Sequence, residues 1–415
     1  MQPTFRLIGY RKALLLFFLI WIVASGLYYI DNLFSPNYHL GYEEGTLHKT
    51  IKYAICVFFT IVLCLISRAY SMLLLIFLVM LLVMLIVMDR GVIDISTLSI
   101  LITATMISYA LVPSIWEYDM RRIGRITVYT GAAIGVFSII EMTILAPLFE
   151  SIWASTGSIR SVSTLFNPSN LGLYSGACLL LLPFLGLRPI NQFVCGGLIF
   201  YAFVMSGSRT AWVALTTVMA YQFFVSTVFR GNVIRLLRRN LFRLIVSLVA
   251  LIFLFTVVSA FNSPLVEIEI VNRGADLYTA SIRWDNFIRF INAIDTSLLI
   301  PDINGQRTDF VHDNFYLVIL NSFGVIGLLM FFAIFSIHFS LRKSKDLDMF
   351  AWKLVFAFYM VAGLSGSQLN SFPNNQLFFL SLGAVYVLNM RFLRKNSTNS
   401  QRLPTKSCAS PILKP

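Results

Sequence analysis

Long apolar runs alternate with short charged or Pro-, Gly- and Asn-containing segments along this 415-residue chain. Many of the runs can cross the hydrocarbon core of a bilayer as helices of roughly 20 residues. They predict twelve membrane spans, near 13–30, 52–67, 71–88, 95–114, 127–147, 171–187, 193–207, 211–229, 244–261, 315–341, 349–366 and 377–390. The predicted fold class is an all-α polytopic membrane protein, with one transmembrane domain over 1–390 and a basic tail over 391–415.

The composition agrees with this interpretation. Hydrophobic residues make up 58% of the chain, charged residues only 12%, and the mean hydropathy is +0.79. Soluble domains carry about 25% charged residues, so a soluble globular enzyme and a disordered protein are both excluded. The net charge of +13 would suggest nucleic acid on a soluble chain. Here loop charge that fixes the topology is the first explanation, and no nucleic-acid partner is expected.

The distribution of charge tests the number of spans independently. With the N-terminus in the cytoplasm, 23 of the 32 Lys and Arg residues fall in inside segments, whereas 14 of the 19 acidic residues fall outside. Inside loops of membrane proteins carry the excess of Lys and Arg, and a wrong number of spans would spoil the alternation. We therefore expect both termini in the cytoplasm.

The longest outside loop is predicted at 262–314, within the transmembrane domain. Loops of this length are usually functional. Between Ala280 and Ile294, apolar residues recur at roughly helical spacing. This pattern predicts a short amphipathic helix on the membrane surface or over a cavity, with Arg283 and Arg289 among its polar positions.

Polar chemistry concentrates in the outside-facing segments. The turn Ser206–Thr210 carries Arg209 and contains no acidic residue. A snorkelling arginine at the interface is the simplest explanation, but a guanidinium also suits two-pronged contacts to phosphate. The other candidate positions in outside segments are Arg160, Asn167, Arg283, Arg289, His312, Asp313 and Asn314.

His312 differs from the other three histidines because Asp309, Asp313 and Asn314 flank it at the mouth of a predicted span. An imidazole in such a place can take a proton near neutral pH. The alternative is an interfacial histidine beside a helix start, with Asp313 or Asn314 as the N-cap.

We expect neither a metal site nor a cofactor. The outside segments contain no HExxH, CxxC or close His pair, and no phosphate-binding loop motif is present. None of the five cysteines falls in an outside loop, so no disulfide framework is implied. Several arginines with one histidine suit an anionic, diphosphate-linked substrate, in which arginine stabilises the leaving group and histidine deprotonates an acceptor hydroxyl.

Three segments carry a resemblance to a known family. They are Gly-Ser-Arg-Thr-Ala at 207–211, Arg-Trp-Asp at 283–285, and the long motif from His312 through Gly324 and Gly327 to Leu328. Together with Phe-Asn-Pro-Ser-Asn-Leu at 166–171, they resemble the O-antigen polymerase and O-antigen ligase superfamily. The motifs cover roughly 155–330, and the topology covers the whole chain. The Asp-Asn-Phe-Tyr-Leu segment is more similar to polymerases than to ligases.

The resemblance implies a twelve-span, metal-independent, inverting glycosyltransferase of the GT-C kind in the bacterial inner membrane. It would act at the periplasmic face on glycan linked to undecaprenyl diphosphate, with a second glycan or lipid A–core as acceptor. Arg209 and Arg283 would match the family's diphosphate-binding arginines, and His312 its proposed base. A chain-length regulator and a flippase are further candidate partners. This chain departs from the family pattern in its reduced glycine stretch, Asn304-Gly305, and in Asp313 between His312 and Asn314.

Four functions are weighed. A polymerase of O-antigen or capsule repeat units is favoured, and a ligase that moves glycan to lipid A–core uses the same chemistry. A flippase or exporter of the same lipid would need charge along a central passage, yet Glu141 is the main charge within a span. A non-catalytic scaffold gives no reason for Arg209, Arg283 and His312 to share one face.

Overall fold

The computed structural model describes part of the chain, and every helix discussed below belongs to that part. The described residues are 116–145, 161, 163–165, 168–230, 285, 288, 314–317, 319–320, 324–326, 328–329, 332, 347–364, 374, 377–378 and 380–382. The predicted spans near 13–30, 52–67, 71–88, 95–114 and 244–261 and the tail at 391–415 lie outside the described residues. So does the outside loop 262–314, apart from Asp285, Ile288 and Asn314 at its end.

The described residues are helical, with no strand among them, in agreement with the predicted all-α class. The main helices are α5 (Trp116–Ile140), α7 (Pro168–Leu181), α8 (Pro189–Met205), α9 (Arg209–Arg230) and α14 (Leu347–Ala362). A π-helical turn, Glu141–Leu145, continues α5, and short 3₁₀ turns cover Ser163–Leu165 and Leu182–Phe184. Each main helix coincides, within a few residues at most ends, with one predicted span.

Two of the helix boundaries have a clear local cause. Pro189 stands at the first position of α8, where its missing N–H costs nothing and its fixed φ suits a helix. The chain leaves α8 at Ser206 and turns through Gly207, whose φ is 55°, a conformation that glycine adopts without strain. Ser208 is the capping residue that precedes α9, as described below.

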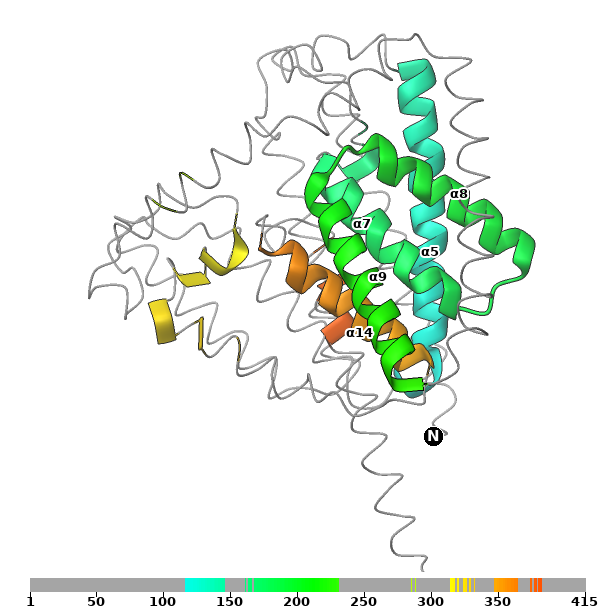
Figure 1. Ribbon diagram of the computed structural model, residues 1–415. Helices are drawn as coiled ribbons and strands as arrows, with labels where there is room; N and C mark the ends of the chain where they lie inside the picture. Colours follow the sequence, from blue (N-terminus) through cyan, green and yellow to red (C-terminus); the bar gives the residue numbers. More distant parts are fainter. Residues whose placement is uncertain are drawn as a thin grey trace, which may run out of the picture.

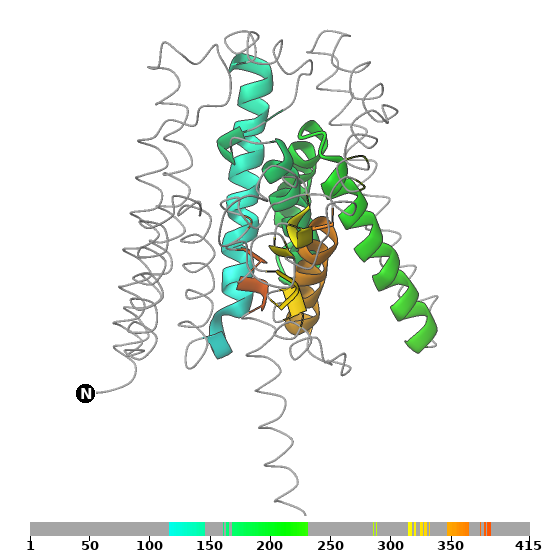
Figure 2. The same cartoon turned by 90° about the vertical axis from the view of Figure 1, so that its left-hand side faces the viewer.

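The helices pack as a bundle, in which α7 and α14 run in opposite directions and α5 and α8 end close together (Figures 1 and 2). α5 packs against α7 and α8, and α14 packs against α7 and α9. Gly131 and Gly135 allow the close approach of α5: an added Cβ would lie 2.9 Å from Cys178 Sγ and 2.4 Å from the Leu198 carbonyl oxygen, respectively. Small residues four apart are typical of contacts between membrane helices.

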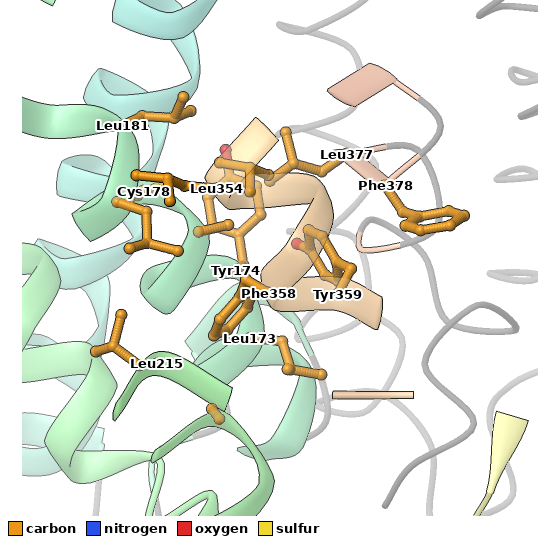
Figure 3. Packing of buried hydrophobic residues seen from close by; sticks show 14 of the residues in the cluster. Leu173, Tyr174, Cys178, Leu181, Leu215, Leu354, Phe358, Tyr359, Leu377 and Phe378 are labelled. Atoms are coloured by element: carbon orange, nitrogen blue, oxygen red, sulfur yellow. The ribbon is translucent and has the colours of Figure 1, made fainter. Parts of the chain in front are cut away.

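The buried core has members on all five main helices, and α7 and α14 meet within it. Figure 3 shows Leu354 and Phe358 of α14 beside Tyr174 and Cys178 of α7, and all four side chains are buried. An added Cβ at Gly176 would come within 2.7 Å of the Phe358 ring, so α7 and α14 are in direct contact. This core fixes how the ends of these helices are placed relative to one another.

Among the described helices, Ile123–Ile144 is long and apolar enough to cross a membrane. Two shorter apolar helices, Pro189–Met205 and Phe350–Ala362, accompany it. The predicted character of a membrane protein is thus supported by one helix of full length.

Candidate functional site

The turn that carries Arg209 is built from buried small polar residues. Ser206 Oγ donates to the Phe203 carbonyl oxygen at 2.7 Å and accepts from the Ser208 N–H at 3.3 Å. Ser208 in turn caps α9: its Oγ accepts from the Ala211 N–H at 3.4 Å, and its carbonyl oxygen accepts from the Trp212 N–H at 3.1 Å. Arg209 therefore occupies the first position of a capped helix.

Arg209 is partly exposed, whereas Ser206, Ser208 and Thr210 around it are buried. The N-terminus of a helix carries a partial positive charge and N–H groups without helical partners. A guanidinium at this place adds a full positive charge. The start of α9 is therefore suited to an anion such as a phosphate group.

Gly172 of α7 packs directly against this turn. A Cβ added at Gly172 would lie 2.6 Å from Ser208 Cβ and 2.7 Å from Ser206 Oγ. Such distances are too short for real side chains, so the turn packs directly on the glycine backbone. The position of Arg209 thus depends on a residue 37 places earlier in the chain.

A buried carboxyl group, that of Glu141, lies at the end of α5. Glu141 is 2% exposed and begins the π-helical turn. Its Oε2 accepts from Ser161 Oγ at 2.5 Å and from the Ser163 N–H at 2.9 Å. Ser138 Oγ lies 2.5 Å from Ser161 Oγ, so three serines and one glutamate form a single hydrogen-bonded group.

Ser161 joins this group to the Arg209 turn. Its N–H donates to the carbonyl oxygen of Met205, the last residue of α8, at 3.0 Å. Arg160, a predicted substrate-binding residue outside the described part, is the chain neighbour of Ser161. We call Ser138, Glu141, Ser161, Ser163 and the turn Ser206–Arg209 together the polar end of the bundle.

The contact between α7 and α14 continues at the same end. Asn374 Nδ2 donates to the carbonyl oxygen of Asn170 at 3.1 Å, and Asn374 Oδ1 accepts from Tyr359 Oη at 2.9 Å. Asn170 and Asn374 are buried. These bonds tie the first turn of α7, next to Gly172, to the last turns of α14.

Asn314 lies where α14 ends. The Phe315 N–H donates to the Gly363 carbonyl oxygen at 3.0 Å, and Asn314 Nδ2 donates to the Leu364 carbonyl oxygen at 2.8 Å. Asn314 Oδ1 accepts from the N–H groups of Tyr316 and Leu317 at 3.0 and 3.2 Å. Asn314 is therefore an N-cap, as the alternative interpretation of the His312 segment predicted. A role for Asn314 in substrate binding stays a prediction.

An apolar cavity of about 420 Å³ adjoins Asn314. Two aromatic rings in its wall, Tyr316 and Phe332, stack with centroids 5.5 Å apart, and Tyr316 Oη donates to the Met360 carbonyl oxygen at 2.6 Å. Its full lining is Asn314, Tyr316, Leu317, Phe332, Met360, Val361 and Leu364. Almost all of the lining is apolar, so it fits a hydrocarbon chain better than a sugar.

The remaining predicted site residues lie outside the described part of the chain: Arg160, Asn167, Arg283, Arg289, His312 and Asp313. Asp285 and Ile288, from the predicted amphipathic helix, are helical and exposed. The structure thus brings together the Arg209 turn, Ser161 and the start of α7. Hydrogen bonds through Asn374 connect the start of α7 to α14, and α14 ends next to Asn314.

Sequence reasoning did not assign a role to Glu141, Ser161 or Ser163. The available signal was Glu141 itself, because an ionisable residue within a membrane span is a functional candidate by default. Among the described residues, no group of three or more His, Cys, Asp or Glu side chains could hold a metal. The wider expectation that the protein needs no metal stays a prediction.

A comparison of this chain with known protein families, curated proteins and solved structures finds no match.

Proposed function

We propose that this chain is a multi-span glycosyltransferase that polymerises oligosaccharide repeat units carried on undecaprenyl diphosphate at the outer face of the bacterial inner membrane. One observation supports the proposal more than any other. Segments far apart in the sequence, all assigned to the outside by their charge pattern, meet at one end of the helical bundle. They are the start of α7, the turn at Arg209, Ser161, which follows Arg160 in the chain, and Asn314, which comes two residues after His312.

The topology proposed with this function has twelve spans and both termini in the cytoplasm. Its support is that Arg125 bonds to Leu185 and Arg188 precedes the start of α8, whereas Arg209 follows the other end of α8. Positive residues gather on the cytoplasmic side of membrane proteins. Arg209 then stands on the outside, where a lipid-linked glycan is presented after translocation.

In the proposed reaction, Arg209 and Arg283 bind the diphosphate of the donor. The acceptor hydroxyl oxygen attacks the anomeric carbon with inversion, and the bond from that carbon to the phosphate oxygen breaks. The electron pair goes to the diphosphate, which the guanidinium groups stabilise, while the hydroxyl proton goes to His312. No metal takes part in this scheme, and Arg160, Asn167, Arg289, Asp313 and Asn314 contribute to substrate binding.

The apolar cavity beside Asn314 supports a lipid-linked donor. Its wall is formed by the start of the segment that follows His312 and by the end of α14. A hydrocarbon chain bound there would hold its diphosphate close to the polar end. A water-soluble sugar nucleotide gives no reason for an apolar cavity at this place.

Deleting the chain and separating the cell's glycans by size tests the function. A single repeat on lipid A–core is expected, since polymerisation stops while ligation continues. Loss of all repeats from the core, with polymer retained on the carrier lipid, would identify a ligase. Complete ladders in the deletion strain would rule out both enzymes.

Labelling of single cysteines in intact cells tests the topology. In a variant without the native cysteines, Arg209→Cys places a thiol at the polar end and Ile190→Cys places one at the opposite end. Position 209 is partly exposed, position 190 is exposed, and both lie between predicted spans. A membrane-impermeant maleimide should label position 209 and spare position 190 until the membrane is opened. The reverse pattern would place Arg209 in the cytoplasm and exclude the proposed site.

A further inference from the structure

Three unusual features coincide at Glu141, which the proposed reaction does not use. Its carboxyl group is buried in an apolar bundle, where an ionisable side chain is costly and seldom without function. It begins a π-helical turn, and such turns occur frequently at functional sites. Its partner Ser163 has a φ of 48°, a left-handed conformation that is strained for a residue other than glycine and tends to cluster at functional sites.

The hydrogen bonds define what the carboxyl group holds. Both recorded bonds converge on Oε2, from the Ser161 hydroxyl and the Ser163 N–H. Because the Ser161 hydroxyl donates its hydrogen to Glu141, its oxygen accepts from Ser138. Ser163 Oγ donates back to the Ile134 carbonyl oxygen of α5 at 2.9 Å. Ser161 and Ser163 are thus fastened to α5 through one carboxyl oxygen and their own hydroxyl groups.

Ser161 is also fastened to the end of α8. The Ser161 N–H donates to the Met205 carbonyl oxygen, four residues before Arg209. Between them lies the compact turn in which Ser206 and Ser208 bond to one another and pack on Gly172. A shift of Ser161 would therefore be transmitted to the first turn of α9.

We propose that Glu141 is a positioning residue, which holds Ser161 and Ser163 in place, with Ser161 bonded to the end of α8, and so fixes the place of Arg209 at the start of α9. The proposal rests on the proposed function for the reaction that Arg209 serves, while the geometric claim stands by itself. Glu141 acts through the hydrogen-bond acceptor at Oε2. It does not carry a proton in the reaction.

Trp212 reports on the geometric claim. It lies in the first turn of α9, with its ring centroid 4.5 Å from that of Phe203 and 6.1 Å from that of Phe200. The chain has six tryptophans, so the full-length protein labelled with 5-fluorotryptophan gives a simple ¹⁹F NMR spectrum, in which Trp212→Phe identifies the signal. We expect Glu141→Ala to shift or broaden this signal. Glu141→Gln should leave it in place, because an amide oxygen can accept both bonds.

Thr143→Ala is the matched control. Thr143 belongs to the same π-helical turn, but its side chain is exposed and bonds only locally, to the Ile139 carbonyl oxygen at 2.7 Å. This variant should leave the Trp212 signal unchanged. Ser161→Ala removes one donor to Glu141 and keeps the carboxyl group, so it should move the signal even if Glu141→Ala fails to fold.

Polymer synthesis by the same variants connects the geometry to the reaction. Glu141→Ala should lower the rate at least about tenfold, the effect of losing a hydrogen bond to a charged group, and Glu141→Gln should stay within roughly threefold of wild type. The shape of the pH–rate profile should be the same in both variants. Added to Arg209→Lys, Glu141→Ala should cost less than it does alone, since residues that act as a unit are not additive.

Two results would overturn the proposal. An unmoved Trp212 signal in folded Glu141→Ala and Ser161→Ala would show that Glu141 does not position the turn, whatever the protein's reaction is. A Glu141→Gln variant as inactive as Glu141→Ala, with its Trp212 signal in place, would assign Glu141 to proton transfer. Absence of polymer synthesis in the wild type counts against the proposed function and leaves the NMR result to decide the geometric claim.

Discussion

The two ends of the helical bundle use polar side chains in different ways. At the end formed by the start of α5 and the residues before α8, Arg125 donates from Nε and Nη2 to the Leu185 carbonyl oxygen, at 3.1 and 3.0 Å. Beside it Phe184 and Phe350 meet edge to face, with ring centroids 5.7 Å apart. The Arg125 side chain there holds the residues between α7 and α8 against α5.

At the polar end, by contrast, a buried carboxyl group, three serines and a capped turn form one connected set. A buried carboxyl group costs free energy unless hydrogen-bond donors satisfy it, and Glu141 has such donors in Ser161 and Ser163. The contrast shows that the end to which the proposed function assigns the site is the one with a connected set of buried polar groups.

Replacing the charge at the polar end should have the largest effect. Arg209→Ala should lower polymer synthesis at least about 100-fold, since it removes a charge that stabilises the leaving diphosphate. The rate is measured with protein amounts matched on immunoblots. Arg188→Ala is the control: Arg188 is exposed at the opposite end and makes no side-chain cap bond to α8, so its loss should change the rate less than about twofold. Equal rates for Arg209→Ala and Arg188→Ala would show that the polar end has no special role in the reaction.

Crowding the turn without changing its charge should have an intermediate effect. Gly172→Val should displace Ser206 and Ser208 and lower the free energy of unfolding by about 1–3 kcal/mol, with polymer synthesis falling roughly tenfold as Arg209 moves. Thermal unfolding in detergent and the rate of synthesis are the measurements. Gly197→Ala in α8 is the matched control, because nothing lies within 4 Å of the added Cβ. It should be stabilising by about 0.5–1 kcal/mol, and a Gly172→Val protein with normal stability and rate would contradict the packing described.

Breaking the opposite end should have the smallest effect on the reaction. Arg125→Ala removes both bonds to Leu185 and should lower the free energy of unfolding by about 1.5–3 kcal/mol. The rate per folded molecule should stay at the wild-type value, since no substrate contact is lost. Arg125→Lys keeps one donor but loses the paired guanidinium N–H groups. Its thermal stability should lie between those of the wild-type protein and Arg125→Ala. A loss of turnover in correctly folded Arg125→Ala would show that both ends serve the reaction.

The helices themselves could be read from the sequence. The predicted spans 127–147, 171–187, 193–207, 211–229 and 349–366 each coincide with a helix. The ends were less accurate, because hydropathy measures what fits a bilayer and not where helical hydrogen bonds begin. α5 begins at Trp116, eleven residues before the predicted span, and carries Arg121 and Arg125 within it.

The candidate site could be read only in part. Arg209 stands out because it is a charge in a turn between two apolar runs, and Asn314 because it precedes an apolar run. The role of Ser161 could not be found, since its partners Glu141 and Met205 lie 20 and 44 residues away in the chain and the serine has no local pattern. The bond between Arg125 and Leu185 joins residues 60 positions apart, and for the same reason the sequence did not predict it.

The central claim is that the polar end holds a diphosphate-linked glycan for transfer, and the purified full-length protein in lipid nanodiscs tests it most directly. Supplied only with an oligosaccharide repeat on undecaprenyl diphosphate, the wild-type protein should form a ladder of longer glycans and release undecaprenyl diphosphate, while Arg209→Ala and His312→Ala should form none. A folded wild-type protein that produces no longer glycan from this donor, or an Arg209→Ala protein that produces the wild-type ladder, would contradict the account.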